Sequence, residues 1–359
     1  MRIVIINRQG DPMSSRLQQA AEPAVPMRSR PFFATVILFG GIALLVLGLA
    51  LSISVGAADI KLSTVWEAVF KFNPDLTQHQ IIQELRLPRA LAGALVGACF
   101  AVAGAIMQGM TRNPLADSGL LGINAGAGFV LALIFAFFPG LPFYFLILYS
   151  FAGAALGMFL VYGIAAISKG GLSPVRLALA GSAVGALLVA FSEGIAIYFH
   201  IGQDLAFWYA GGVAGTKWLQ LKIMAPWVAG GLLGAMMLSR SITLLSLGDE
   251  VASGLGQRTG WVKLAGSVLV LVLAGAAVSA VGSIGFIGLV IPHVARYLVG
   301  VDYRWIIPCS AVLGSLLTVM ADTAARMINP PYETPIGALI ALIGVPFFLY
   351  LARREGRNL

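Results

Sequence analysis

Three arginines stand out as residues that could bind a charged partner. Arg86 and Arg89, in the string RLPR, and Arg326 each flank a long apolar stretch. An arginine can donate two parallel hydrogen bonds to a carboxylate, so these side chains could receive carboxylates of an extracytoplasmic protein. The alternative is that they only anchor the apolar stretches, with their charged ends among lipid headgroups.

The polar segment 241–260, SITLLSLGDEVASGLGQRTG, is a second candidate site of contact. Asp249 and Glu250 suit the N-terminus of a short helix, and Gly254 and Gly256 lie where that helix would end. A short amphipathic helix on the cytoplasmic face would serve as a docking element. A plain connector between two spans is the alternative.

Glu193 is an ionisable residue inside an apolar stretch, near its predicted outer end. Such a residue is costly in a membrane and usually faces a cavity or a partner. We expect either an interfacial carboxylate or a side chain that lines a substrate vestibule. Trp208 and Tyr209, in the string FWYAGG, belong either to an interfacial aromatic belt or to a short helix that frames the entrance.

The motifs of nucleotide hydrolysis and of metal or covalent catalysis are missing from the sequence. It has no G-x-x-x-x-G-K-[ST], G-x-S-x-G or H-E-x-x-H string. His79, His200 and His293 are far apart, and Cys99 and Cys309 lie in apolar runs, so neither a metal site nor a disulfide is indicated. We therefore expect no enzymatic activity and no cofactor on this chain. If nucleotide drives its function, ATP and magnesium bind to a partner.

The composition is that of a membrane protein built from helices. Of 359 residues, 59% are apolar and 11% are charged, and the mean hydropathy is +0.91. A soluble domain carries roughly 25% charged residues, so a soluble enzyme is excluded. A spanning helix needs about 20 apolar residues, and the chain offers about ten such runs, at 32–54, 89–109, 119–138, 143–167, 175–199, 223–243, 262–282, 284–300, 306–327 and 335–352. The eighth run is short and contains Pro292, which favours a bent or partial span.

The distribution of basic residues predicts that both termini are cytoplasmic. With ten spans and an inner N-terminus, 16 of the 23 Lys and Arg residues lie on the inner side, as they usually do in membrane proteins. The same bias accounts for the net charge of +8 without nucleic acid. Residues 1–31 are then a flexible cytoplasmic tail, 32–352 a membrane domain, and 353–359 a second cytoplasmic tail.

Two of the predicted spans carry small residues at every fourth position. In lipid, such stripes let helix backbones approach closely. We expect them to build a tightly packed bundle, and a solute path along the same faces is a further interpretation. The stripes are Gly93, Gly97, Ala101, Ala105 and Gly109 in the second span, and Ala178, Ser182, Ala186, Ala190 and Gly194 in the fifth.

Two Asn-Pro strings predict turns on opposite sides of the membrane. They are RNPLADSGLLG at 112–122, on the inside, and NPPYETPIG at 329–337, on the outside. Each turn is followed by an acidic residue and a glycine. This similarity indicates an inverted repeat of the kind found in transporters.

These strings together resemble the FecCD-type permeases of ABC importers, which take up ferric siderophores, haem and cobalamin. The resemblance runs from about residue 60 to 352. One departure is Ser118, where the family often has proline. The resemblance rests on Gln108, on Asp302 with Arg304, and on RLPR at 86–89, NPLADSGLLG at 113–122, LSPVRLALAG at 172–181, LGDEVASGLG at 247–256, GFIGLVIPHVAR at 285–296, ADTAAR at 321–326 and ETPIG at 333–337.

The resemblance implies a role for each candidate site. Arg86, Arg89 and Arg326 would receive carboxylates of a substrate-binding protein. Glu193 and Trp208 stay candidates for the substrate vestibule without support from the family. The cytoplasmic gate would be formed by Leu172, Ser173 and Pro174, and contacts with the ATPase would come from Leu247, Gly248, Asp249, Glu250, Ser253 and Gly256.

The resemblance also implies the assembly. The chain would be the all-α translocation subunit of an ABC importer of type II architecture, in the bacterial cytoplasmic membrane. It would pair with an identical or homologous permease chain, with ATPase subunits that hold ATP and magnesium, and with an extracytoplasmic binding protein. A ferric siderophore, of the hydroxamate type, is the expected cargo. Cobalamin or haem import is the alternative, and an ion-coupled secondary transporter is a more distant one.

Overall fold

The computed structural model describes residues 29–56, 60–167, 174–329 and 332–355, and every regular element within these ranges is helical. The elements, in chain order, are α2 (Pro31–Ser54), α3 (Leu62–Phe70), α4 (Thr77–Ile81), a π-helical turn (Ile82–Arg86), α5 (Leu87–Thr111), a 3-10 turn (Ser118–Leu121), α6 (Ile123–Phe137), α7 (Phe143–Ile167), α8 (Pro174–Phe199), α9 (Gly202–Ala210), α10 (Trp218–Ser246), α11 (Asp249–Gly254), α12 (Thr259–Val281), α13 (Ile287–Val299), α14 (Tyr303–Ile328) and α15 (Ile336–Glu355).

The prediction of about ten spans is confirmed. The ten apolar runs correspond to α2, α5, α6, α7, α8, α10, α12, α13, α14 and α15. Among the described residues, seven helices are long and apolar enough to cross a membrane, and α6, α13 and α15 supply three shorter apolar helices. The third run begins later than predicted, at Ile123, because the chain first makes the 3-10 turn that ends at Gly122, whose φ is +71°.

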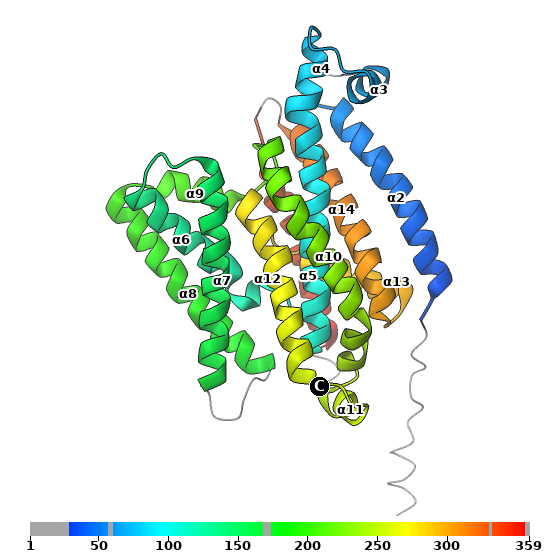
Figure 1. The fold of residues 1–359 in the computed structure, drawn as a ribbon, viewed down its shortest axis with the longest axis vertical. Coiled ribbons are helices and arrows are strands. Elements are labelled where there is room, and N and C mark those ends of the chain that lie inside the picture. The colour runs from blue at the N-terminus through cyan, green and yellow to red at the C-terminus, as the bar shows by residue number, and fades with distance from the viewer. Residues whose placement is uncertain (1–28, 57–59, 168–173, 330–331, 356–359) are drawn as a thin grey trace, which may run out of the picture.

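The helices form two neighbouring groups, one of them around α5 (Figure 1). α5 is almost wholly buried, and α10, α12, α13 and α14 pack around it, with α2 against α14. The second group is α6, α7 and α8, and α12 contacts both α5 and α7. A helix that is apolar on all sides, as α5 is, is expected to lie in the interior of the bundle.

Glycines allow the backbones to approach closely at the centre. A Cβ atom on Gly97 would lie 2.2 Å from the carbonyl oxygen of Gly314 in α14, and one on Gly104 would lie 1.9 Å from that of Gly288 in α13. The predicted packing of the small-residue stripe in α5 is therefore confirmed.

The second stripe, in α8, does not pack within the chain. Ser182, Ala186, Ala190 and Gly194 are exposed, whereas the buried face of α8 holds Val184 and other apolar residues. The prediction of close packing inside this bundle is wrong for α8. Its small residues lie on an open face of the single chain.

The eighth span is partial, as its length and Pro292 predicted. α12 ends at Val281, residues 282–286 are not helical, and α13 has only 13 residues. At a rise of 1.5 Å per residue this helix is about 20 Å long, shorter than the roughly 30 Å hydrocarbon core. Gln108 of α5 donates hydrogen bonds to the carbonyl oxygens of Gly288 and Leu289, which fixes the start of α13 against α5.

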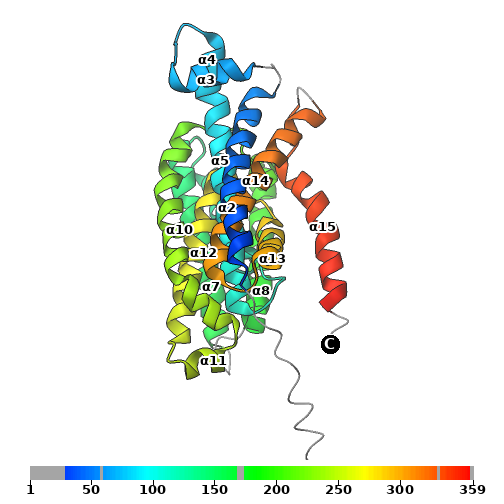
Figure 2. The ribbon, with the colours of Figure 1, turned by 90° about the vertical axis from the view of Figure 1, so that its right-hand side faces the viewer.

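The two ends of the bundle carry different elements (Figures 1 and 2). One end holds α11, the start of α2 and the end of α15, whereas α3, α4, the end of α14 and the start of α15 lie at the other. The two Asn-Pro strings lie between α5 and α6 and between α14 and α15, and Pro330 and Pro331 of the second string lie outside the described residues. The inverted repeat inferred from them stays a prediction.

Candidate functional site

Arg89 lies at the centre of an ion-pair network at the end of the bundle that holds α3 and α4. Its Nε and Nη2 atoms donate to both carboxylate oxygens of Asp322 in α14, at 2.8–3.1 Å. Its Nη1 and Nη2 atoms donate to Glu333 at 2.7 and 2.8 Å. The side chains of Arg89 and Asp322 are 11% and 4% exposed, whereas that of Glu333 is 52% exposed. The guanidinium group thus has one buried partner and one accessible partner.

Arg86 and Arg326 donate hydrogen bonds to backbone carbonyl groups at the C-terminal end of α2. Arg86 Nη1 donates to the carbonyl oxygens of Ile53 and Ser54, at 2.7 and 2.9 Å. Arg326 donates to the carbonyl oxygen of Val55 at 3.1 Å and lies 3.3 Å from Asp322. The last carbonyl groups of a helix lack partners within the helix and carry partial negative charge, so two cations there are favourable.

The local sequence explains how two arginines reach this site from one helix. Pro88 has no backbone N–H, so the regular hydrogen-bonding pattern cannot continue through it. The chain makes the π-helical turn just before it, in which the N–H of Leu87 donates to the carbonyl oxygen of Ile82. Such widened turns are frequent at functional sites. Arg86 and Arg89 are three residues apart and share a face, so both point toward the ends of α2 and α14.

The structure brings together the three arginines predicted to dock a binding protein, but each already has partners within the chain. Their docking role stays a prediction, and it now requires an exchange of partners at Arg89. Hydrogen bonds from Arg89 hold the pKa of the Glu333 carboxyl below its ordinary value, so Glu333 is ionised at neutral pH. Sequence reasoning missed this network, although the acids in ADTAAR and ETPIG supplied the signal.

α11 lies at the opposite end, within the segment 241–260. The prediction of a short helix that starts at Asp249 and stops near Gly254 is confirmed. The part of this segment that lies between the two long helices is shorter than expected from the sequence, because α10 continues to Ser246 and α12 begins at Thr259. Gly248 and Gly256 flank α11 with φ angles of +126° and +82°, which only glycine adopts readily.

The surface of α11 suits contact with another protein. Val251 and Leu255 are exposed, whereas Ala252 is buried against the bundle. Leu247 and Gly248 lead into the helix, Glu250 is exposed beside Asp249, and the Ser253 hydroxyl donates to the Asp249 carbonyl oxygen. Exposed apolar residues with acidic neighbours are suited to contact with another protein, but contact with an ATPase stays a prediction.

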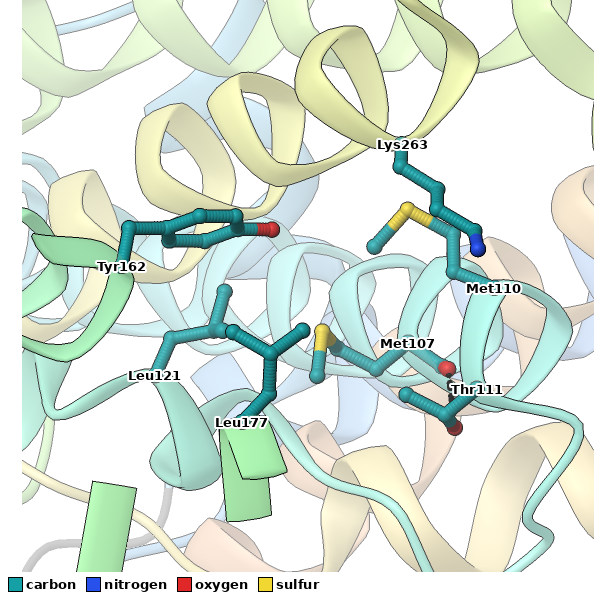
Figure 3. Close-up of a pocket in the computed structure, with 7 residues that line it drawn as sticks. All are labelled: Met107, Met110, Thr111, Leu121, Tyr162, Leu177 and Lys263. Atoms are coloured by element: carbon teal, nitrogen blue, oxygen red, sulfur yellow. Dashed lines mark hydrogen bonds between the residues drawn. The ribbon is translucent and has the colours of Figure 1, made fainter. Parts of the chain in front are cut away.

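A small cavity of about 30 Å³ lies near the same end, where α5, α7, α8 and α12 meet (Figure 3). Its lining is mainly apolar, with Lys263 and Tyr162 on opposite sides. Pro174, predicted to belong to the gate, is the first residue of α8. Leu172 and Ser173, its predicted partners, lie outside the described residues.

Glu193 and Trp208 lie on neighbouring elements, α8 and α9, which contact each other. Glu193 is exposed in the single chain, and Trp208 packs against the main core. The first residues of the string FWYAGG belong to the short helix α9. Whether this helix lies in an aromatic belt or frames an entrance stays a prediction, as does a vestibule role for Glu193. Among the described residues, no group of three His, Cys, Asp or Glu side chains is placed to hold a metal ion.

Comparison with known proteins places this architecture in a family. Residues 44–354 match the FecCD transport family. The permease protein FhuB of the iron(3+)-hydroxamate import system of Bacillus subtilis is 56% identical over 359 residues, which cover 99% of this chain and 94% of that protein. The haemin transport permease HmuU of Yersinia pestis is 37% identical, with 89% and 96% covered.

A solved structure supports the same conclusion. A metal-chelate type ABC transporter in an inward-facing conformation is 29% identical and superposes with a TM-score of 0.78, over 89% of this chain and 99% of that one. The matches in sequence and in fold both cover nearly the whole chain. The protein is a multi-pass permease of the bacterial cytoplasmic membrane and belongs to the FecCD transport family.

Proposed function

We propose that this permease carries a ferric siderophore of the hydroxamate class into the cytoplasm as the translocation subunit of an ABC importer. The observation that carries the proposal is the 56% identity, over nearly both chains, to a permease of an iron(3+)-hydroxamate import system. Relatives whose names indicate haemin or ferric citrate transport are less similar, at 37% and 45% identity. ATP and magnesium bind to the partner ATPase in this proposal.

The open face of α8 supports assembly with a second permease chain, identical or homologous. Exposed small residues can accept another helix closely, and a second permease chain across that face would supply one. The exposed carboxylate of Glu193 lies on the same helix. Each permease chain would offer one α11, so the pair would engage two ATPase subunits at the cytoplasmic end.

Docking of the binding protein would occur at the other end, through Arg86, Arg89 and Arg326. Glu333 is the replaceable partner of Arg89 because its side chain is half exposed, whereas Asp322 is buried. A carboxylate of the binding protein can take the place of Glu333 without leaving Arg89 unpaired.

ATP binding would close the ATPase dimer, and α11 would pass this motion to the connection between α7 and α8. That connection includes the predicted gate residues Leu172, Ser173 and Pro174. Alternating access of this kind requires that nucleotide and loaded binding protein each favour one conformation over the other.

Uptake by whole cells tests the cargo. A bacterium that lacks its own ferric hydroxamate permease would receive this chain together with its cognate ATPase, partner permease and binding protein. We expect the cells to accumulate radioactive iron from a ferric hydroxamate, and unlabelled ferric hydroxamate to compete where haem and cobalamin do not. Accumulation of cobalamin or haem, without uptake of the ferric hydroxamate, would contradict the proposed cargo and leave the importer class intact.

A further inference from the structure

Side-chain contacts hold α11 and the residues that follow it to the two neighbouring helices. The side chain of Gln257, three residues after the end of α11, donates to the carbonyl oxygen of Ser241 in α10 at 2.9 Å. On the α12 side, Lys263 Nζ lies 2.7 Å from Asp249 Oδ2. The second contact joins the first residue of α11 to the first turns of α12, across 14 positions of the chain.

The two glycines that flank α11 make this side-chain contact important for motion. Gly248 and Gly256 have φ angles of +126° and +82°, and glycine changes its backbone conformation at lower cost than other residues, so the chain can turn at both ends of α11. A displacement of α11 would be absorbed at these glycines if only the backbone joined it to α12. The ion pair with Lys263 supplies a second connection.

The contact continues from α12 to α7 through a serine. The Ser267 hydroxyl, one turn after Lys263 and fully buried, donates to the Lys263 carbonyl oxygen at 2.8 Å. The Tyr162 hydroxyl of α7 forms a hydrogen bond with the same Ser267 oxygen. Tyr162 is five residues before the end of α7 at Ile167. A chain of polar contacts therefore leads from α11 to the end of α7.

The cavity in Figure 3 lies between these groups and leaves room for movement. Its volume, about 30 Å³, is enough for a water molecule, since about 10–15 Å³ of such volume is needed for one. A fully packed interior resists small displacements. Here the Tyr162 ring and the Lys263 side chain border unfilled space, so a small displacement of either side chain meets less resistance than in a fully packed interior.

We infer that Lys263 is a positioning residue that transmits displacement of α11 to α12 and, through Ser267 and Tyr162, to α7. This inference rests on the proposed function, because it concerns how an ATPase docked at α11 drives transport. The Lys263 side chain binds Asp249 of α11, and the Lys263 carbonyl oxygen in the α12 backbone accepts the hydrogen bond from Ser267.

The test compares transport with ATP hydrolysis in one preparation. The complete importer would be reconstituted in liposomes, and iron uptake per ATP hydrolysed would be measured for Lys263→Met, Tyr162→Phe and the double variant. We expect each single variant to keep the ATPase bound, because a partly exposed ion pair and one hydroxyl contribute little to assembly. Uptake per ATP is expected to fall by about fivefold or more, the lower range for energetic coupling between sites. The double variant should be no worse than Lys263→Met alone, since both changes interrupt one path.

Two further variants separate transmission from simple stability. Lys263→Arg keeps the ion pair with Asp249 and should retain the wild-type uptake per ATP. Arg240→Met removes an exposed positive charge from α10 at the same end, and it should leave the ratio unchanged.

The wild-type importer distinguishes failure of the inference from failure of the proposed function. If it takes up no ferric hydroxamate with ATP, the proposed function is wrong. If the wild-type importer transports and Tyr162→Phe takes up as much iron per ATP as the wild type, the proposed path to α7 does not exist. This conclusion holds for any uptake per ATP measured with Lys263→Met. A wild-type ratio in Lys263→Met would overturn the role of Lys263 itself.

Discussion

Replacing Arg89 with glutamine is expected to destabilise the permease by about 3 kcal/mol, the cost of breaking a buried ion pair by removing one partner. Without the Arg89 guanidinium, the carboxylates of Asp322 and Glu333 would both depend on Arg326 for a positively charged partner. The Asp322 side chain is only 4% exposed, so solvent cannot replace the lost ion pair. Glutamine cannot compensate either charge. The free energy of unfolding would be measured in detergent from denaturant titrations of the purified chain.

Glu333→Gln is the matched control for this prediction. Its side chain is 52% exposed, so its bond to Arg89 is screened by solvent, and a loss below about 1 kcal/mol is expected. Arg89 keeps Asp322 in this variant. If the two variants unfold at the same denaturant concentration, Arg89 does not hold the end of the bundle through Asp322, and the account of this network is wrong.

Gly104→Ala is expected to be among the most damaging single-methyl changes in the chain. The added Cβ would lie 1.9 Å from the carbonyl oxygen of Gly288, and a backbone atom cannot move aside as a flexible side chain can. α13 would have to shift away from α5, which would also weaken the hydrogen bonds from Gln108. We expect a loss of about 3 kcal/mol, at the upper end of the usual cost of overpacking.

Gly163→Ala in α7 is the control for Gly104→Ala. A Cβ at Gly163 would meet nothing within 4 Å, and alanine is favoured over glycine in a helix by up to about 1 kcal/mol. The control should therefore be neutral or slightly stabilising in thermal unfolding. Equal destabilisation by the two substitutions would show that close approach of α5 and α13 does not limit stability.

Some elements of this fold could be predicted from the sequence. They are the ones determined by neighbouring residues, namely by the length of an apolar run and by the residues that start or end a helix. The ten spans, the partial α13 and the short helix α11 belong to this class. The boundary at Ile123 was missed because the turn before it depends on the positive φ of Gly122.

Features that depend on contacts between distant residues could not be predicted in the same way. Arg89 and Asp322 are separated by 233 positions, and nothing in the spacing of either residue identifies the other as its partner. The same applies to Tyr162 and Ser267, 105 positions apart. The small residues of α5 and α8 look alike in sequence, yet only those of α5 are buried in the chain, because the spacing of small residues does not indicate which helix face meets another helix of the same chain.

The central claim is that an ATPase docked at α11 drives a ferric hydroxamate through this permease. The most direct measurement is uptake of radioactive ferric hydroxamate into liposomes that hold the full importer, with binding protein outside and either ATP or ADP sealed inside. A variant with Val251→Asp and Leu255→Asp would test the exposed apolar surface of α11. We predict uptake with ATP, none with ADP, and none with ATP in the double variant. Equal uptake with ATP and ADP, or undiminished uptake by the double variant, would contradict the claim.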